Sequence, residues 1–275
     1  MQRRGTVIGQ AVSAAIGGSI AGPAVGALAS VVGRPTLFIA LASLALGLAA
    51  ITRRLEAPPP IASVDPGSPD PAEPAPGTAI RTLLARPSGL GGIWLMTLPA
   101  IVSGTLTVLG PLALHPLGAG PGIIGVTFVV AAALESLVST WVGGVSDRHG
   151  RLAPLVGSFA AAGVALALFA TADSVVALVV VIGLTAVGTG AAWTPAMALL
   201  ADLSEAVGLD QAYGAGLMNI AWAAGQIVGS LGSGAAARAS SNAVPTVVVG
   251  GLCLLSAAVV LRAQRTVAQP ARPWV

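Results

Sequence analysis

Charged side chains are scarce in this sequence. Only 8% of the 275 residues carry a charge, lysine is absent, and all 13 basic residues are arginine. A soluble domain has about 25% charged residues, so this chain has too little charge to cover a water-facing surface. The net charge of +3 comes from scattered residues, and without a basic stripe it gives no sign of a nucleic-acid-binding protein. The composition therefore points to an integral membrane protein.

Residues for covalent or metal chemistry are equally few. A single cysteine, Cys253, excludes a disulfide framework and any metal site built from several cysteines. His115 and His149 have no ligand-type neighbours at metal-binding spacing. No nucleophile–base pair, phosphate-binding loop or zinc spacing occurs in the sequence. We therefore expect no enzyme activity, no cofactor and no metal.

Long apolar segments dominate what is present. A bilayer core needs roughly 20 apolar residues per helix. The segments are rich in Ala, Gly, Val and Leu without an alternating polar face, which favours helices over the strands of a membrane barrel. We predict an all-α membrane protein with eight spans, at residues 6–30, 34–52, 91–113, 121–144, 153–171, 175–200, 212–236 and 243–262.

A proline-rich segment at residues 55–78 separates the first two spans from the other six. Its composition is typical of an extended or disordered linker. After it, Ile80, Leu83 and Leu84 are interspersed with Arg81 and Arg86, which predicts a short stretch lying along the membrane surface.

The first 30 residues allow a second interpretation. Arg3 and Arg4, the apolar stretch and the small residues before Ser30 also fit a cleavable signal peptide. Six glycines, and a spacing that recurs later in the chain, favour a membrane span instead.

Arginine positions predict the orientation. With eight spans, 11 arginines share one side of the membrane, and only Arg34 and Arg238 lie on the other. Because arginine concentrates in cytoplasmic loops, we expect the linker and both termini in the cytoplasm, and the protein in the cell membrane.

The glycine spacing of the first span recurs 207 residues later. Gly9, Gly18 and Gly22 correspond to Gly216, Gly225 and Gly229. In the following spans, Pro35-Thr36 corresponds to Pro245-Thr246. Repeated helical units are typical of secondary transporters. If residues 1–52 superpose on 212–262, four helices lack a counterpart, so we expect the C-terminal two-thirds of a twelve-helix protein.

Two motifs resemble the major facilitator superfamily, and more narrowly its drug:proton antiporters. The residues from Gly143 to Arg151 are similar to the G-x3-D-R-x-G-R loop. The first span is similar to the antiporter motif G-x8-G-x3-G-P-x2-G-G, with Ala27 in place of the last glycine. The resemblance implies family helices five to twelve: residues 1–54 as the end of an N-terminal bundle, 55–89 as linker and juxtamembrane segment, and 90–275 as the C-terminal six-helix bundle.

For the loop motif, the resemblance implies a latch between the two bundles. We expect Asp147 to approach residues 5–8, and Arg148 or Arg151 to pair with Asp202 or Glu205. Gly143 and Gly150 belong to the same motif, and Gly150 suits a tight turn. The alternative is a plain turn whose arginines anchor it at the interface.

For the antiporter motif, the resemblance implies a seal between the two bundles. Its residues are Gly9, Gly18, Gly22, Pro23 and Gly26. Glycines four apart let another helix press close, and proline bends its helix. The alternative is simple helix packing.

Glu135 is the only carboxylate deep within a predicted span. Placing an acid at the bilayer centre costs about 2.5–3.5 kcal/mol on insertion scales, which indicates a use. Our hypothesis is a proton-coupling site or a counter-charge for a cationic substrate. The alternative is a structural hydrogen bond to Gln10 or Gln226.

The resemblance implies that the third and sixth spans line a central cavity. Aromatic and hydroxyl side chains there would suit amphipathic or aromatic substrates. Trp94 fits an interfacial anchor equally well, and Asn219 and Gln226 on the seventh span fit either the cavity or helix packing. The candidates are Trp94, Ser103, Thr105, Thr107, Thr189, Trp193, Thr194, Asn219 and Gln226.

The function implied is a secondary transporter that exports small, drug-like molecules by exchange with protons. With counterparts of family helices one and four missing, we expect no transport from this chain alone. The alternative is a non-transporting membrane module for binding or regulation. The expected partners are the lipid bilayer, a small-molecule substrate and protons, without nucleic acid.

Overall fold

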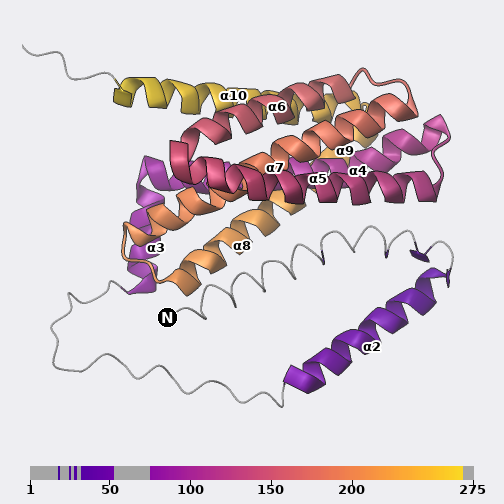
Figure 1. Ribbon diagram of the computed structural model, residues 1–275, viewed down its shortest axis with the longest axis horizontal. Helices are drawn as coiled ribbons and strands as arrows, with labels where there is room; N and C mark the ends of the chain where they lie inside the picture. Colours follow the sequence, from indigo (N-terminus) through magenta and orange to yellow (C-terminus); the bar gives the residue numbers. More distant parts are fainter. Residues whose placement is uncertain (1–17, 19–24, 26–27, 30–31, 53–74, 269–275) are drawn as a thin grey trace, which may run out of the picture.

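The computed structural model describes residues 18, 25, 28–29, 32–52 and 75–268, and these ranges contain helices and no strand (Figure 1). The elements are α2 (Arg34–Thr52), α3 (Pro76–Ala85), α4 (Pro87–Leu114), the 3-10 turn η1 (His115–Leu117), α5 (Pro121–His149), α6 (Leu152–Phe169), α7 (Val175–Glu205), α8 (Gln211–Ile227), the π-helical turn η2 (Val228–Gly232), α9 (Ser233–Ala239) and α10 (Ala243–Ala268).

Six helices in the described ranges are long and apolar enough to cross a membrane: α2, α4, α5, α6, α7 and α10. The predicted span at 212–236 corresponds to α8, η2 and α9, which follow one another without a non-helical residue. The all-α membrane fold is therefore confirmed. The first predicted span, 6–30, falls almost entirely outside the described residues.

One boundary prediction was wrong in an informative way. We expected a loop after residue 144, but α5 continues to His149, so most of the G-x3-D-R-x-G-R motif is helical. Polar side chains beyond the apolar core are compatible with a helix, and the helix ends only at Gly150. Gly150 has φ +84°, which L side chains rarely adopt. The turn is therefore confined to the motif's last two residues.

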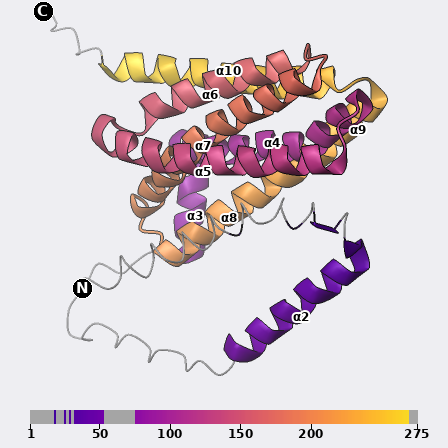
Figure 2. The same ribbon diagram turned by 45° about the vertical axis from the view of Figure 1, so that its right-hand side comes forward.

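α7 lies at the centre of the bundle and packs against α4, α5 and α6, while α10 packs along α6 and α8 packs along α4. Figures 1 and 2 both show α6 and α10 side by side at one edge. The core between these helices is fully buried and aliphatic or aromatic, as at Leu98, Phe159, Leu166 and Ile182. The bundle thus buries one face of each helix and leaves the other for lipid.

Small residues set the closest helix contacts. A Cβ added to Gly188 of α7 would lie 2.8 Å from the backbone nitrogen of Ala162 in α6. One added to Gly163 of α6 would lie 2.8 Å from the carbonyl oxygen of Gly250 in α10. Because lipid gives apolar side chains no reason to prefer one another, such backbone contacts are a main source of helix affinity in membranes.

The two N-terminal helices differ in their surroundings. None of the residues of α2 is buried, and both views show it apart from the bundle (Figure 2). α3 buries Ala79 and Leu83 and packs against α4 and α7. One face of residues 76–85 therefore packs on protein, and our expectation that this stretch lies along the membrane surface stays a prediction.

Candidate functional site

An aromatic and thioether pocket lies where α4, α7 and α8 meet. The edge-to-face pair of Trp193 and Trp222 forms its wall, with ring centroids 4.3 Å apart at 73°. The cavity has a volume of about 80 Å³, and the other side chains that line it include Met96, Met197, Met218 and Asn219. We call this the tryptophan pocket.

Helical spacing explains why these side chains converge. Trp193 and Met197 are four residues apart on α7, and Met218 and Trp222 are four apart on α8. Side chains at this spacing lie on one helix face, so each helix presents one indole and one thioether. Met96 of α4 is fully buried beneath them.

Trp222 and the three methionines were not among the residues predicted from the sequence. A signal was present: apart from Met1, the chain has three methionines, and two of them lie four residues from a tryptophan. Of the predicted cavity residues, Trp193 and Asn219 are in the pocket. Asn219 donates a hydrogen bond to the carbonyl of Ala215, 3.0 Å away.

Ser103 and Thr107, which we assigned to the cavity, and Gln226, for which the cavity and helix packing were both open, do not line the tryptophan pocket. Gln226 Nε2 donates to Ser103 Oγ at 3.3 Å, joining α8 to α4. Thr107 is exposed, and its hydroxyl bonds the carbonyl of Ser103 on its own helix. These polar groups therefore make hydrogen bonds within or between helices and are not directed into the pocket.

Three consecutive residues of α4 form a polar seam with the neighbouring helix. Beside the Ser103–Gln226 bond, Ser230 donates to the carbonyl of Gly104 at 3.3 Å. The buried hydroxyls of Thr105 and Ser233 are 2.8 Å apart. A Cβ on Gly104 would lie 2.6 Å from the carbonyl oxygen of Gln226, so the backbones touch here. The seam spans the π-helical turn η2, and it fixes α4 against α8 and α9.

Other predicted cavity residues also bond within or between helices. Trp94 Nε1 donates to Ser256 Oγ of α10 at 2.9 Å. Thr189 is buried and bonds carbonyls of its own helix. Thr194 lies 2.6 Å from Ser139 of α5, hydroxyl to hydroxyl. Only the α7 face that carries Trp193 and Met197 reaches the pocket.

An ion pair joins the turn after α5 to the end of α7. Arg151 Nε lies 2.7 Å from Asp202 Oδ2, and a second guanidinium nitrogen lies 3.3 Å from Oδ1. The two-pronged geometry is typical of strong Arg–carboxylate recognition. This is one of the pairings expected from the sequence. Arg148 and Glu205 are both exposed.

The glycine that opens the motif packs between helices. A Cβ on Gly143 would lie 3.2 Å from Thr194 Cγ2 of α7. The hydroxyl of Ser146, in the next turn, is buried without a hydrogen-bond partner among the described residues. The side chain of Asp147 and residues 5–8 lie outside what the structure describes, so their expected contact stays a prediction.

The model of the major facilitator superfamily matches residues 95–274. The chain belongs to the major facilitator superfamily. A search of the curated proteins finds no match. The matched region begins in α4 and includes every later helix of the bundle. A chain of this superfamily is a multi-pass membrane protein of the secondary transporter class, with the bilayer and small molecules as its general partners.

Within this superfamily bundle, Glu135 lies on α5 beside α7. The backbone of Glu135 packs directly against Gly190, where a side chain would clash. No described residue gives its half-buried carboxyl a hydrogen bond. Gln226 bonds Ser103 instead, so that part of the structural alternative was wrong, and Gln10 lies outside the described residues. Glu135 is not among the residues that line the tryptophan pocket.

The superfamily's antiporter motif falls largely outside the described residues. Gly9, Gly22, Pro23 and Gly26 are not described, and Gly18 is helical with open space around it. Of the corresponding glycines of the repeat, Gly225 and Gly229 are tightly packed, whereas Gly216 has open space around it. A Cβ on Gly225 would lie 2.6 Å from the carbonyl oxygen of Thr97. The internal repeat itself stays a prediction.

Proposed function

We propose that this chain forms the substrate-binding half of a proton-coupled exporter of small, drug-like molecules. The observation that carries the proposal is the tryptophan pocket, which gathers side chains from three helices, α4, α7 and α8. Ligand sites are typically apolar and aromatic hollows with a few polar groups. Asn219 supplies the polar group here.

The lining favours aromatic or delocalised cationic ligands. None of the residues that line the pocket carries a charge. A compact, strongly hydrated ion would therefore lose its water in the pocket without finding a charged group in its place. Indole faces attract cations and stack on aromatic rings. Methionine side chains are flexible and adapt to different shapes. Together these properties suit a site that accepts several related substrates.

Glu135 is our proposed proton carrier. Gly190, which contacts its backbone, precedes Trp193 by three residues, a rise of about 4.5 Å along α7. The carboxyl is thus close to the level of the tryptophan pocket and has no described hydrogen-bond donor. Each proton that crosses a 100 mV potential supplies about 2.3 kcal/mol to drive export.

The Arg151–Asp202 pair is our proposed gate element. It joins the turn after α5 to the end of α7, so the two helices would move together when the bundle rocks. The arginine bias favours a cytoplasmic position for this pair. There the pair would stabilise the end of the bundle at which Asp147 is expected to contact the N-terminal bundle. Both chain termini would then lie in the cytoplasm of the cell-membrane protein.

We also infer that this chain alone does not transport. At about 80 Å³, the pocket would hold one aromatic ring of a ligand and not the whole molecule, since typical ligand sites measure roughly 300–1,000 Å³. Helices of a second bundle would have to supply the opposite wall. Alternating access in such transporters comes from rocking one bundle against the other.

Binding of radiolabelled tetraphenylphosphonium to the purified chain in neutral detergent tests the pocket. Trp222→Ala should weaken binding by roughly tenfold, since it removes a stacking and cation-attracting face. Trp141→Ala is the matched control, because Trp141 is exposed on α5 away from the pocket. Equal affinity for all three proteins would overturn the pocket assignment.

Proton release tests the coupling. Adding tetraphenylphosphonium to the detergent-solubilised chain in weak buffer should release protons, which a pH-sensitive dye records. Glu135→Gln should abolish the release, whereas Glu205→Gln, at the exposed end of α7, should not. Release that persists in Glu135→Gln would reject Glu135 as the carrier and leave the pocket standing.

A second candidate function is a non-transporting binding or regulatory module. The favouring observation is that α4 to α10 form a packed bundle while α2 buries no residue. Proteoliposomes with an imposed pH gradient separate the two. Accumulation of tetraphenylphosphonium by this chain alone would refute both the module and our inference of inactivity. Binding without proton release would favour the module.

A further inference from the structure

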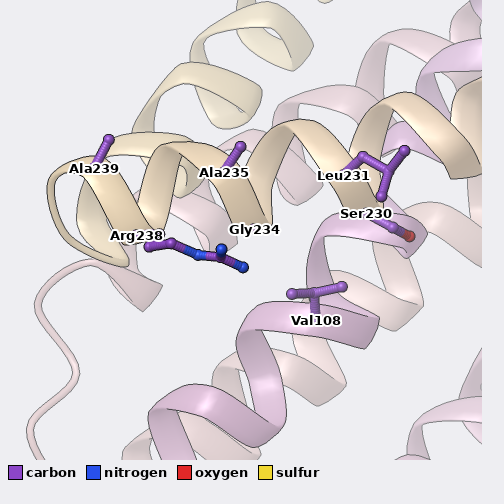
Figure 3. Close-up of a pocket in the computed structure, with 7 residues that line it drawn as sticks. All are labelled: Val108, Ser230, Leu231, Gly234, Ala235, Arg238 and Ala239. Carbon is purple, nitrogen blue, oxygen red and sulfur yellow. The ribbon is translucent and has the colours of Figure 1, made fainter.

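A second and larger hollow lies at the opposite end of the bundle from the Arg151–Asp202 pair. It is a groove of about 730 Å³ between α4 and the segment formed by η2 and α9. Figure 3 shows Val108 of α4 on one side, with Leu231 and Ala235 on the other. Arg238 is the charged residue among those that line it. We call this the arginine groove.

The Arg238 side chain turns into the groove. Figure 3 shows it running back along α9 beneath Gly234, on the side that faces Val108. Gly234 leaves this space free because it has no side chain. An arginine near the end of a membrane helix usually extends toward water, past the helix end. Here the guanidinium lies instead over an apolar surface inside the last two turns of α9.

Arg238 has no partner among the described residues: it makes no ion pair and no hydrogen bond there. Asp173, in the turn between α6 and α7, is the described carboxylate on this end of the bundle, and it makes no ion pair with Arg238. Within the described part of the chain, the groove therefore combines apolar walls with one positive charge that has no counter-charge.

We propose that the arginine groove binds an anionic membrane lipid. The headgroup phosphate would accept hydrogen bonds from the Arg238 guanidinium, whose planar fork matches phosphate geometry. One acyl chain would lie along Val108, Leu231 and Ala235. A free inorganic anion would make no use of these apolar walls. This site is separate from the tryptophan pocket, and it stands whether or not the chain transports.

The headgroup, and not the acyl chain, supplies the selectivity. An acyl chain gains little on leaving the bilayer for an apolar groove, because both surroundings are equally apolar. A single arginine near the membrane surface favours an anionic lipid by about fivefold over a zwitterionic one. The proposal therefore predicts a preference for phosphatidylglycerol over phosphatidylcholine with the same acyl chains.

Native mass spectrometry of the full chain, released from neutral detergent with equal amounts of the two lipids, measures this preference. Phosphatidylglycerol should be retained about fivefold more than phosphatidylcholine. Arg238→Gln should abolish the preference. Arg34→Gln is the matched control, because it removes the same charge from the first residue of α2. Equal loss in both variants would show diffuse charge attraction and overturn the site.

Two further arms complete the test. Gly234→Leu keeps the arginine but fills the groove, so it should lower retention of phosphatidylglycerol while the melting temperature stays near wild type. Retention unchanged in Gly234→Leu would overturn the acyl-chain assignment. Inorganic phosphate at millimolar concentration should not displace the lipid. Displacement by phosphate would identify a free-anion site and reject the lipid.

Discussion

α2 and α6 are nearly alike as sequences and unlike as parts of the structure. They have 19 and 18 residues and the same mean hydropathy. Eight residues of α6 are buried, whereas α2 buries none. The difference lies in a few small residues. Gly163 of α6 meets the backbone of α10, while Gly47 of α2 has open space around it. Hydropathy thus predicts that a helix enters the membrane, and shape decides which helix it contacts.

The largest effect that would test this comparison comes from a side chain at the α6–α10 contact. In Gly163→Leu, a Cβ would already lie 2.7 Å from Leu254 Cγ and 2.8 Å from a backbone carbonyl. We expect overpacking to cost about 1–3 kcal/mol. Thermal unfolding in detergent, followed by tryptophan fluorescence, measures the loss.

Two control variants make this test specific. Gly47→Leu in α2 and Gly157→Leu in α6 place the same side chain where a Cβ has nothing within 4 Å. Both should unfold near the wild-type temperature. A destabilisation by Gly47→Leu as large as that by Gly163→Leu would show that α2 has a tight helix partner after all.

A smaller effect is expected from the polar seam. Thr105→Val keeps the side-chain shape and removes the hydroxyl that lies 2.8 Å from Ser233. The buried Ser233 hydroxyl then loses its partner, which should lower the free energy of unfolding by about 1 kcal/mol. Denaturant unfolding in mixed micelles measures it.

The α2 counterpart of this variant is Ser43→Ala. The Ser43 hydroxyl bonds the carbonyl of Ile39 within its own helix, so its removal leaves no buried group on another helix unpaired. The change should stay below about 0.5 kcal/mol. If Thr105→Val changed the free energy of unfolding as little as Ser43→Ala, the polar seam would contribute nothing to the packing of α4.

The smallest effect is expected at the Arg151–Asp202 pair. The two side chains are 31% and 53% exposed, so water screens them, and Arg151→Ala should cost at most about 1 kcal/mol. Arg34→Ala at the start of α2 removes the same charge as a control. Salt should shrink the difference between the two variants, and a difference that persists in 1 M NaCl would contradict the screening argument.

The sequence predicted the helices better than their ends. Apolar length placed α2 at residues 34–52, as the structure has it. It placed the end of α5 too early, because a helix continues beyond the lipid until a residue such as Gly150 breaks it. Hydropathy indicates which residues lie in lipid, whereas the backbone conformation of a single glycine determines where the helix ends.

The candidate site was predictable only in part. Trp193 was found because it is aromatic on a span expected to face a cavity, and Asn219 because it is polar on a span that fitted either the cavity or helix packing. Ser103 and Gln226 met the same criteria but bond each other across the seam. Which face of a uniformly apolar helix points inward depends on contacts between helices, and no amphipathic pattern records it. The spacing of tryptophan and methionine on α7 and α8 was the better guide.

The π-helical turn η2 determines which way the side chains of α9 point relative to those of α8. A π turn closes its hydrogen bonds one residue later than an α turn, so it accommodates one extra residue before α9. If residues 228–232 instead wound as a regular α-helix with no residue removed, α9 would rotate by about 100° relative to α8, whereas deleting one of them would leave its orientation nearly unchanged. Such a rotation would take Ser233 away from Thr105 and turn Arg238 out of the arginine groove. By taking up the extra residue, the π turn therefore keeps both groups on the side that faces α4.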